Sequence, residues 1–228
     1  MTINSVLIAN RGEIAVRVIR ACRALGIRSV QAYSMADVDS LAVRLADEAV
    51  EIGPPPAAKS YLNIEALIVA ARATGVDAVH PGYGFLAENA DFADAVVAAG
   101  MIFVGPDGDS IRLLGDKVSA RQVAAKAGVP TVPGSNGRIG EIDEARGIVE
   151  DIGFPVMIKA VAGGGGRGIR VAADFDEFER FFPQASSEAA AAFSDGGLYI
   201  EKLINPARHI EVQVLGDGQI DHGSWARP

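Results

Sequence analysis

The sequence predicts an α/β protein that opens with a parallel β-sheet covered by helices on both faces, and three observations predict it. Short apolar runs alternate with amphipathic helical segments over residues 1–105. The apolar runs are nearly continuous, as is typical of parallel strands that are buried on both faces. Several helical segments are followed by glycine, the residue that most often ends a helix. Regular alternation of this kind predicts successive β-α units that share one sheet.

The first part of the chain contains the strands and helices of this sheet. The expected strands cover residues 5–9, 29–33, 49–52, 78–80 and 102–104. The expected helices cover residues 13–25, 41–47, 64–74 and 92–99. Gly26, Gly75 and Gly100 follow three of these helices and support their predicted ends. In such sheets, ligands bind at the carboxyl ends of the strands.

The pattern changes after Gly105. One or two helices are expected over residues 109–127, and another helix over residues 141–152. The further expected elements are a strand over residues 154–158 that leads to Lys159, a strand over 169–171, a helix over 175–193 that is broken at Pro183, and strands over 198–202 and 209–215.

The composition is that of a soluble globular protein. Of the 228 residues, 49% are hydrophobic and 22% are charged, which excludes intrinsic disorder. The net charge of −8 argues against a nucleic-acid partner, because nucleic-acid binding normally requires a basic face. No apolar run reaches the length of a membrane span and no signal peptide is recognisable, so we expect a cytoplasmic protein. The single cysteine, Cys22, lies in an apolar helical pattern and is expected to be buried and unreactive.

Residues 159–170 carry the strongest functional signal. Lys159 ends an apolar strand, and a run of glycines and an arginine follow it. Glycines allow bare backbone N–H groups to approach a bulky anion closely, and the two cations add positive charge. The lysine precedes the glycines, so the segment is not a P-loop. We predict a lid between two strands that closes over a polyphosphate; the alternative is a hairpin loop without a ligand.

Polar residues near the end of the chain are further candidates. Glu201 and Lys202 end an apolar strand and could meet adenine, because a carboxylate suits its amino group or its ribose. The alternative is a solvated pair on an edge strand. His209, Glu211 and Gln213 share one face by a period of two, and they could line a site or form the solvated side of a sheet.

Three other segments are weaker candidates. Lys117 stands alone at a helix start and could equally be a surface lysine. Residues 10–13 occupy the first turn between a strand and a helix, where the helix N-terminus favours anions. Residues 80–84 form a loop shaped by glycine, which could be a structural turn only.

Taken together and in this order, these motifs resemble biotin carboxylase, the ATP-grasp component of acetyl-CoA carboxylase and related acyl-CoA carboxylases. The matching motifs are residues 8–15, 59–63, 80–89, 115–117, 159–168, 201–202 and 208–214. The similarity extends to about Gly218, and residues 221–228 depart from the family pattern.

The resemblance implies a Rossmann-like domain over residues 1–115 and an ATP-grasp region over residues 116–228, which we expect to be truncated. It also implies an ATP site: Lys117 and Lys159 at the phosphates, Gly165 and Gly166 in the lid, Glu201, Lys202, Leu203 and Ile204 at the adenine, and His209 near the sugar. The residues that hold Mg²⁺ and act on bicarbonate in the family are expected to lie beyond Pro228, so the resemblance names no metal ligand and no catalytic residue in this chain.

In the family, MgATP and bicarbonate form carboxyphosphate, and the carboxyl group then passes to the ureido nitrogen of biotin on a carrier protein or domain. The resemblance therefore implies ATP, Mg²⁺, bicarbonate and carrier-bound biotin, and it allows a homodimer. We expect this chain to be the N-terminal portion of such an enzyme, limited to partial ATP binding. The alternatives are another ATP-grasp ligase and a non-catalytic partner of full-length carboxylase subunits.

Overall fold

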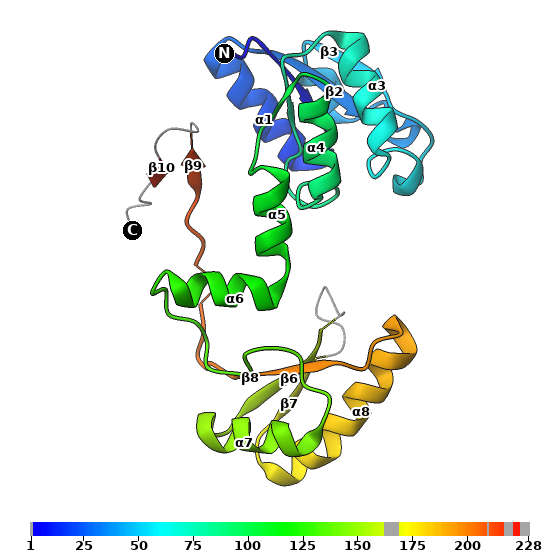
Figure 1. Cartoon of the computed structure of the whole chain (residues 1–228). Helices are drawn as coiled ribbons and strands as arrows, with labels where there is room; N and C mark the ends of the chain where they lie inside the picture. The colour runs from blue at the N-terminus through cyan, green and yellow to red at the C-terminus, as the bar shows by residue number, and fades with distance from the viewer. Residues whose placement is uncertain (1, 162–168, 209, 217–220, 224–228) are drawn as a thin grey trace. The chain divides into compact units, whose positions relative to one another are not determined.

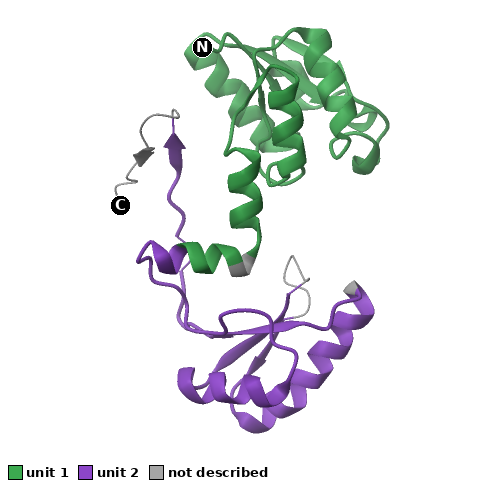
Figure 2. Cartoon of the chain, viewed as in Figure 1, with its two compact units in different colours: residues 1–123 green, residues 124–228 purple. Residues whose placement is uncertain are grey.

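The computed structural model describes residues 2–161, 169–208, 210–216 and 221–223. The chain forms two compact units, Met1–Val123 and Ala124–Pro228, which are coloured separately in Figure 2. Each unit has a sheet and a hydrophobic core of its own, so each is described by itself.

The first unit contains a five-stranded sheet in which every neighbouring pair is parallel. Its strands are β1 (Ser5–Ile8), β2 (Arg28–Tyr33), β3 (Glu48–Glu51), β4 (Ala78–His80) and β5 (Ile102–Phe103), in the spatial order β3-β2-β1-β4-β5. The five strands predicted from the sequence are confirmed, with bounds that differ by one residue at most at either end. The strand order reverses between β1 and β4, where open α/β sheets bind ligands.

Helices cover both faces of this sheet. The helices that pack on the sheet are α1 (Gly12–Leu25), α2 (Leu41–Leu45), α3 (Ile64–Thr74) and α4 (Ala90–Ala98). Further along the chain come α5 (Gly108–Gly115) and α6 (Lys117–Lys126), and η1 (Met35–Asp37) and η2 (Ala57–Lys59) are short 3-10 turns. Alternate residues of β1 divide the core: Ile8 packs with α1 on one side, and Leu7 packs with α3 and α4 on the other. Cys22 is buried in the α1 layer, and burial raises the pKa of its thiol, as expected of an unreactive cysteine.

Two helix ends in this unit depend on hydrogen bonds of aspartate side chains. The helix expected over residues 41–47 ends at Leu45, because the Asp47 carboxylate accepts hydrogen bonds from the backbone N–H and the hydroxyl of Ser29, at 2.8 and 2.7 Å, and ties the chain to β2. The segment expected as one or two helices over residues 109–127 forms two. Asp116 separates them with an extended backbone and accepts a hydrogen bond from the Ser119 N–H at 2.7 Å.

The second unit is a three-stranded antiparallel sheet with helices on one side. Its elements are α7 (Ile142–Ile152), β6 (Val156–Ala160), β7 (Ile169–Ala172), α8 (Phe175–Phe193) and β8 (Leu198–Lys202), with the strand order β7-β6-β8. Figure 1 shows α7 and α8 on the same side of this sheet. Val156, Ile158 and Ile200 point to these helices and are fully buried.

The expected break of α8 at Pro183 is wrong, because the helix is continuous through the proline. Phe178 and Phe182 before the proline, and Ala185 and Ala189 after it, are buried in the same core. Proline removes one backbone hydrogen bond from a helix interior. Burial of the same helix face on both sides of Pro183 offsets that loss.

The strand expected over residues 209–215 is wrong for most of its length. The structure has β9 (Val214–Gly216), which pairs with β10 (Asp221–Gly223), and residues 210–213 form no strand. Ile210 and Val212 are 73% and 61% exposed, so the apolar face of the alternation is not covered. Alternation predicts a strand only where a neighbouring strand accepts and donates its backbone hydrogen bonds.

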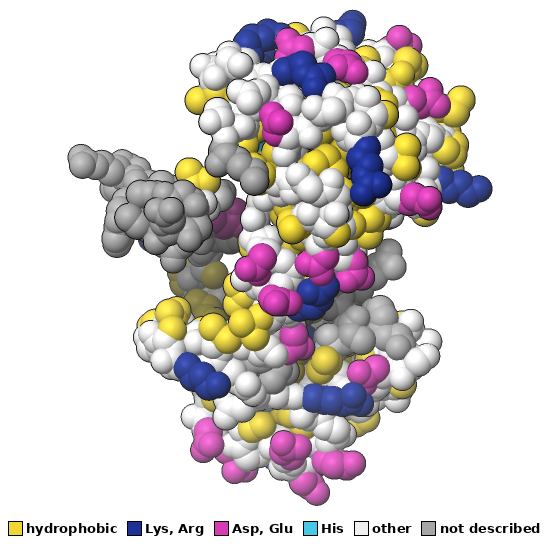
Figure 3. All heavy atoms as spheres, turned by 45° about the horizontal axis from the view of Figure 1, so that its top comes forward, with side chains coloured by type: hydrophobic (Ala, Val, Ile, Leu, Met, Phe, Trp, Pro, Cys, Tyr) yellow, Lys and Arg dark blue, Asp and Glu magenta, His cyan; other side chains and the backbone are white. Residues whose placement is uncertain are grey.

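No helix among the described residues is long and apolar enough to cross a membrane. On the face drawn in Figure 3, acidic and basic side chains are interspersed and do not form one basic patch.

We expect Gly134→Ala to lower the free energy of unfolding of the second unit by about 1–3 kcal/mol. Gly134 lies against the edge of β8, and a Cβ atom there would overlap the backbone carbonyl oxygen of Ile200. Urea denaturation of the two proteins measures the difference. Gly140→Ala is the matched control, because a Cβ atom at Gly140 would meet nothing within 4 Å. Equal unfolding midpoints for the two variants would contradict the prediction.

Candidate functional site

In the part of the chain that the structure describes, one face of the β7-β6-β8 sheet carries no core helix. Residues of the three strands alternate in direction, so those opposite the buried set share this open face. The cross-strand pairs that define it are Met157 with Glu201 and with Val171, and Lys159 with Tyr199 and with Ile169. Ile169 and Val171 are exposed, and the other four are half-buried. The face therefore combines an apolar surface with two charged side chains.

Lys159 and Glu201 form an ion pair on the open face. The Lys159 Nζ atom lies 2.5 Å from Glu201 Oε2, and the two side chains are only 19% and 16% exposed. Burial acts to lower the pKa of Lys159, but the hydrogen bond and the charge of Glu201, with a contribution from Tyr199, outweigh it, so the pKa lies above its usual value. Lys159 is therefore a fixed cation at neutral pH.

Lys202 does not pair with its neighbour Glu201, because successive residues of a strand point to opposite faces. Its ammonium donates hydrogen bonds to the backbone carbonyls of Gly153, at 3.1 Å, and Phe154, at 2.6 Å, just after the end of α7. A cation at this position stabilises the carboxyl end of a helix. The alternative of a solvated Glu–Lys pair is therefore wrong: each residue has a separate partner.

The remaining adenine-site candidates follow the end of β8. The Leu203 N–H donates to the Pro155 carbonyl at 3.0 Å, which continues the strand pairing by one residue, and Ile204 is 49% exposed. The structure thus brings Lys159 and Glu201 together on the open face, whereas Leu203 and Ile204 follow the other end of the β6-β8 pair, beside Pro155. It places the ammonium of Lys202 at the end of α7.

Four candidates fall outside what the structure describes. Gly165 and Gly166 belong to the segment 162–168, and neither this segment nor His209 is among the described residues. Lys117 is the first residue of α6, and its side chain is not described. Their roles at an ATP site stay predictions.

Two loop motifs of the first unit, residues 10–13 and residues 80–84, are joined by hydrogen bonds. The Asn10 side-chain amide donates to the carbonyls of Pro81, at 2.7 Å, and Tyr83, at 2.8 Å. Gly82 lies so close to Asn10 that a Cβ atom would approach its Nδ2 atom to 2.7 Å, and His80 Nδ1 accepts from the Gly82 N–H at 2.9 Å. Burial lowers the pKa of His80, which keeps the ring neutral and able to accept. These contacts support the interpretation of residues 80–84 as a structural turn.

A cluster next to this turn escaped the sequence analysis. The Arg11 guanidinium lies 5.6 Å from the centres of the Tyr61 and Phe85 rings, which stack 5.0 Å apart. It also lies 3.6 Å from the Asp37 carboxylate. No spacing rule joins positions so far apart in the chain, so nothing in the local sequence could have found the cluster.

We expect the stability of the first unit to fall between about pH 10 and pH 12 through Tyr61. The buried phenol donates to Asp37 Oδ2 at 2.9 Å, and chiefly its burial raises its pKa to about 12. A pKa raised on folding means that stability is fully present below the unfolded value of ~10 and is lost as pH approaches 12. Tyr61→Phe should flatten this alkaline decline in urea denaturation series at pH 8–12. An identical decline in both proteins would contradict the assignment.

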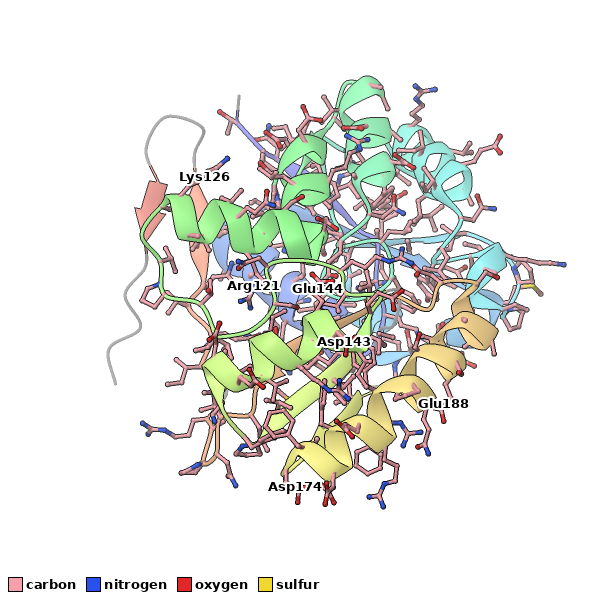
Figure 4. The ribbon with its side chains drawn as sticks, turned by 60° about the horizontal axis from the view of Figure 1, so that its bottom comes forward. Arg121, Lys126, Asp143, Glu144, Asp174 and Glu188 are labelled. Atoms are coloured by element: carbon pink, nitrogen blue, oxygen red, sulfur yellow. The ribbon has the colours of Figure 1, made fainter. Side chains whose placement is uncertain are left out.

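The described residues do not form a metal site. No group of three or more His, Cys, Asp or Glu side chains is placed among them to hold a metal ion. Two acidic residues labelled in Figure 4 serve the fold: Asp174 caps α8 by accepting from the Glu177 N–H at 2.9 Å, and Glu188 pairs with Arg170 at 2.6 Å. A magnesium site therefore has no observed ligand set in this part of the chain.

Two family models match the chain, one after the other. Residues 2–111 match the biotin carboxylase N-terminal domain, and residues 116–222 match the ATP-binding domain of the carbamoyl-phosphate synthase L chain. The biotin carboxylase of Pseudomonas aeruginosa is 54% identical over 218 residues, which is 95% of this chain and 49% of that protein. The mitochondrial propionyl-CoA carboxylase alpha chain of Sus scrofa is 52% identical over 95% of this chain and 30% of its own length.

Solved structures give the same result for the fold. A biotin carboxylase from Campylobacter jejuni, in a β-γ-ATP complex, matches with a TM-score of 0.84 and 46% identity, over 95% of this chain and 48% of that one. The biotin carboxylase domain dimer of the 2-oxoglutarate carboxylase from Hydrogenobacter thermophilus, in complex with MgADP, ADP and bicarbonate, matches with a TM-score of 0.78 and 47% identity, over 90% of this chain and 45% of that one. The chain spans about half the length of these biotin carboxylases. In sequence and in fold, the chain corresponds to the N-terminal half of proteins of the biotin carboxylase family.

Proposed function

We propose that the chain binds ATP on the open face of the β7-β6-β8 sheet, as the nucleotide-binding portion of a biotin carboxylase. The observation that carries this proposal is the Lys159–Glu201 pair, a fixed cation and a carboxylate 2.5 Å apart on a partly apolar sheet face. Lys159 is followed in the sequence by the glycine-rich segment 162–168. A biotin carboxylase relative that is 54% identical and a solved relative in a β-γ-ATP complex support the choice of nucleotide.

The residues of the site then have distinct roles. Lys159 neutralises phosphate charge, and Glu201 accepts a hydrogen bond from the adenine amino group, while Leu203 and Ile204 contribute apolar surface. By resemblance, Lys117 also contacts the phosphates, Gly165 and Gly166 belong to the lid, and His209 lies near the sugar. Lys202 acts through the strand backbone, since its ammonium is bound to carbonyls after α7.

The reaction served by this site is the carboxylation of biotin on a carrier protein or domain. The terminal phosphoryl group of ATP is transferred to bicarbonate, which releases ADP. The resulting carboxyphosphate gives its carboxyl group to the ureido nitrogen of biotin and releases inorganic phosphate. Stabilising the charge of the transferred phosphoryl group is the main demand on the protein, and Lys159 meets part of it. Residues 1–115 would form the Rossmann-like domain and residues 116–228 the ATP-binding region. A homodimer and a cytoplasmic location belong to the same proposal.

Calorimetric titration of the chain with ATP tests the nucleotide site. We expect a saturable heat with ATP and a weaker interaction with GTP, because guanine presents an oxygen where adenine presents the amino group to Glu201. An absence of binding at millimolar ATP would overturn the proposal. Inorganic tripolyphosphate serves as the control for binding through charge alone.

A second candidate is an ATP-dependent ligase that does not use biotin. The match of residues 116–222 to the carbamoyl-phosphate synthase model favours it, and the match of residues 2–111 favours the biotin branch. Phosphate release from ATP separates the two when the chain is mixed with the C-terminal half of the Pseudomonas aeruginosa relative. Stimulation by biotin in the presence of bicarbonate supports a biotin carboxylase, and a rate that biotin does not change supports the second candidate.

A further inference from the structure

Among the six residues named above for the open face, Tyr199 is the polar one that has no role in the proposed function. It is the direct cross-strand partner of Lys159, whereas Glu201 lies two residues further along β8. Direct and diagonal cross-strand neighbours on one face are within contact distance of a long side chain. Lys159 therefore projects between an aromatic residue and a carboxylate on the same strand.

The contacts of Lys159 agree with this register. Its Nζ atom lies 5.5 Å from the centre of the Tyr199 ring and 2.5 Å from Glu201 Oε2. An ammonium has three donors and a flexible four-carbon stem. One carboxylate can direct such a group without fixing its position, whereas two contacts from different directions fix it.

We propose that Tyr199 is a positioning residue of the nucleotide site, which acts by holding the Lys159 ammonium in the place where it meets the phosphates. This inference rests on the proposed function. A second carboxylate in place of Tyr199 would also orient the lysine, but it would cancel the charge that attracts the nucleotide. A phenol attracts the cation through its ring and its oxygen and adds no negative charge. When a phosphate competes with Glu201 for the Lys159 ammonium, the uncharged Tyr199 side chain still contacts that ammonium.

A role in sheet packing must be separated from this positioning role, because aromatic residues stabilise half-buried strands in general. Phe181 offers a matched control: it is a half-buried aromatic residue of α8, outside the open face, and its ring centre lies 5.6 Å from the Arg170 guanidinium. Phe181→Leu removes an aromatic ring beside a cation in the same unit and leaves Lys159, Tyr199 and Glu201 in place.

The experiment compares Tyr199→Leu, Tyr199→Phe and Phe181→Leu. Calorimetry with ATP should show affinity about 2- to 5-fold weaker for Tyr199→Leu, the fold-change that corresponds to one cation–aromatic contact, a smaller loss for Tyr199→Phe, and no loss for Phe181→Leu. NMR titration of the isotope-labelled Lys159 ammonium, without nucleotide, should show a lower pKa in both Tyr199 variants. In a Lys159→Met background, Tyr199→Leu should have no further effect on ATP affinity.

These readouts separate the two proposals. If the parent chain binds no ATP but the pKa of Lys159 falls in the Tyr199 variants, the proposed function fails and the contact between Tyr199 and Lys159 stands. If ATP binds and the Tyr199 variants equal Phe181→Leu in both readouts, the positioning role is overturned. If Tyr199→Leu does not fold, Tyr199→Phe decides the outcome through the same two measurements. The positioning role would also be overturned if Tyr199→Leu weakened ATP binding equally in the parent chain and in the Lys159→Met background, because Tyr199 would then not act through Lys159.

Discussion

Phe178→Ala is expected to lower the free energy of unfolding of the second unit by about 3–5 kcal/mol. Phe178 is fully buried between α8 and the sheet, with its ring centre 5.6 Å from that of Phe182. The substitution removes the apolar area of the ring and leaves a cavity that the closely packed core fills only in part. Urea denaturation, followed by hydrogen exchange of amides in β6 and β8, measures the loss.

The control for Phe178 lies on the same helix. Phe175 is 38% exposed and contacts Phe154 edge to face, with ring centres 4.8 Å apart. Its replacement by alanine should therefore cost less than half as much, because solvent occupies the space that the ring leaves. Equal losses for the two variants would mean that the core of this unit is not organised around Phe178.

Lys159→Met is expected to weaken ATP binding by roughly one to two orders of magnitude, since a charge-assisted contact contributes about 1.5–3 kcal/mol. The substitution removes a cation that the hydrogen bond and the charge of Glu201 keep protonated against the effect of burial, and it leaves the Glu201 carboxylate, 16% exposed, without its ammonium partner. The uncompensated carboxylate would also repel the phosphates. Calorimetric titration with ATP measures the affinity.

Lys59→Met is the matched control for this experiment. Lys59 is exposed at the end of η2 in the first unit, and its loss changes the net charge by the same amount. ATP affinity should be unchanged in this variant. If both variants bind ATP as the parent chain does, Lys159 has no part in nucleotide binding, and the site must be sought elsewhere.

Local signals were sufficient for most of the secondary structure. In the first unit, the strands and the helix ends at Gly26 and Gly75 were predicted, and both glycines adopt the left-handed conformation that ends a helix. They could be predicted because capping depends on residues within one turn of each other. The bound of α2 could not, because it depends on the contact between Asp47 and Ser29, 18 positions apart.

The two wrong predictions share one cause. Proline was expected to break α8 and alternation was expected to form a strand over residues 209–215, and both rules consider the segment in isolation. At Pro183, a core that the helix shares with the sheet outweighs the lost hydrogen bond. At residues 210–213, no strand among the described residues pairs with the segment. Long-range burial and pairing decided both cases.

The candidate site divides in the same way. The sequence by itself determined which residue types are present: a lysine before a glycine run, and a carboxylate and an amine at the end of an apolar strand. Only the tertiary structure decided that Lys159 lies between Tyr199 and Glu201, and that Lys202 binds carbonyls after α7. The reason is physical: contacts across a sheet depend on the register of strands some 40 residues apart, and a shift of one residue would move each side chain to the other face.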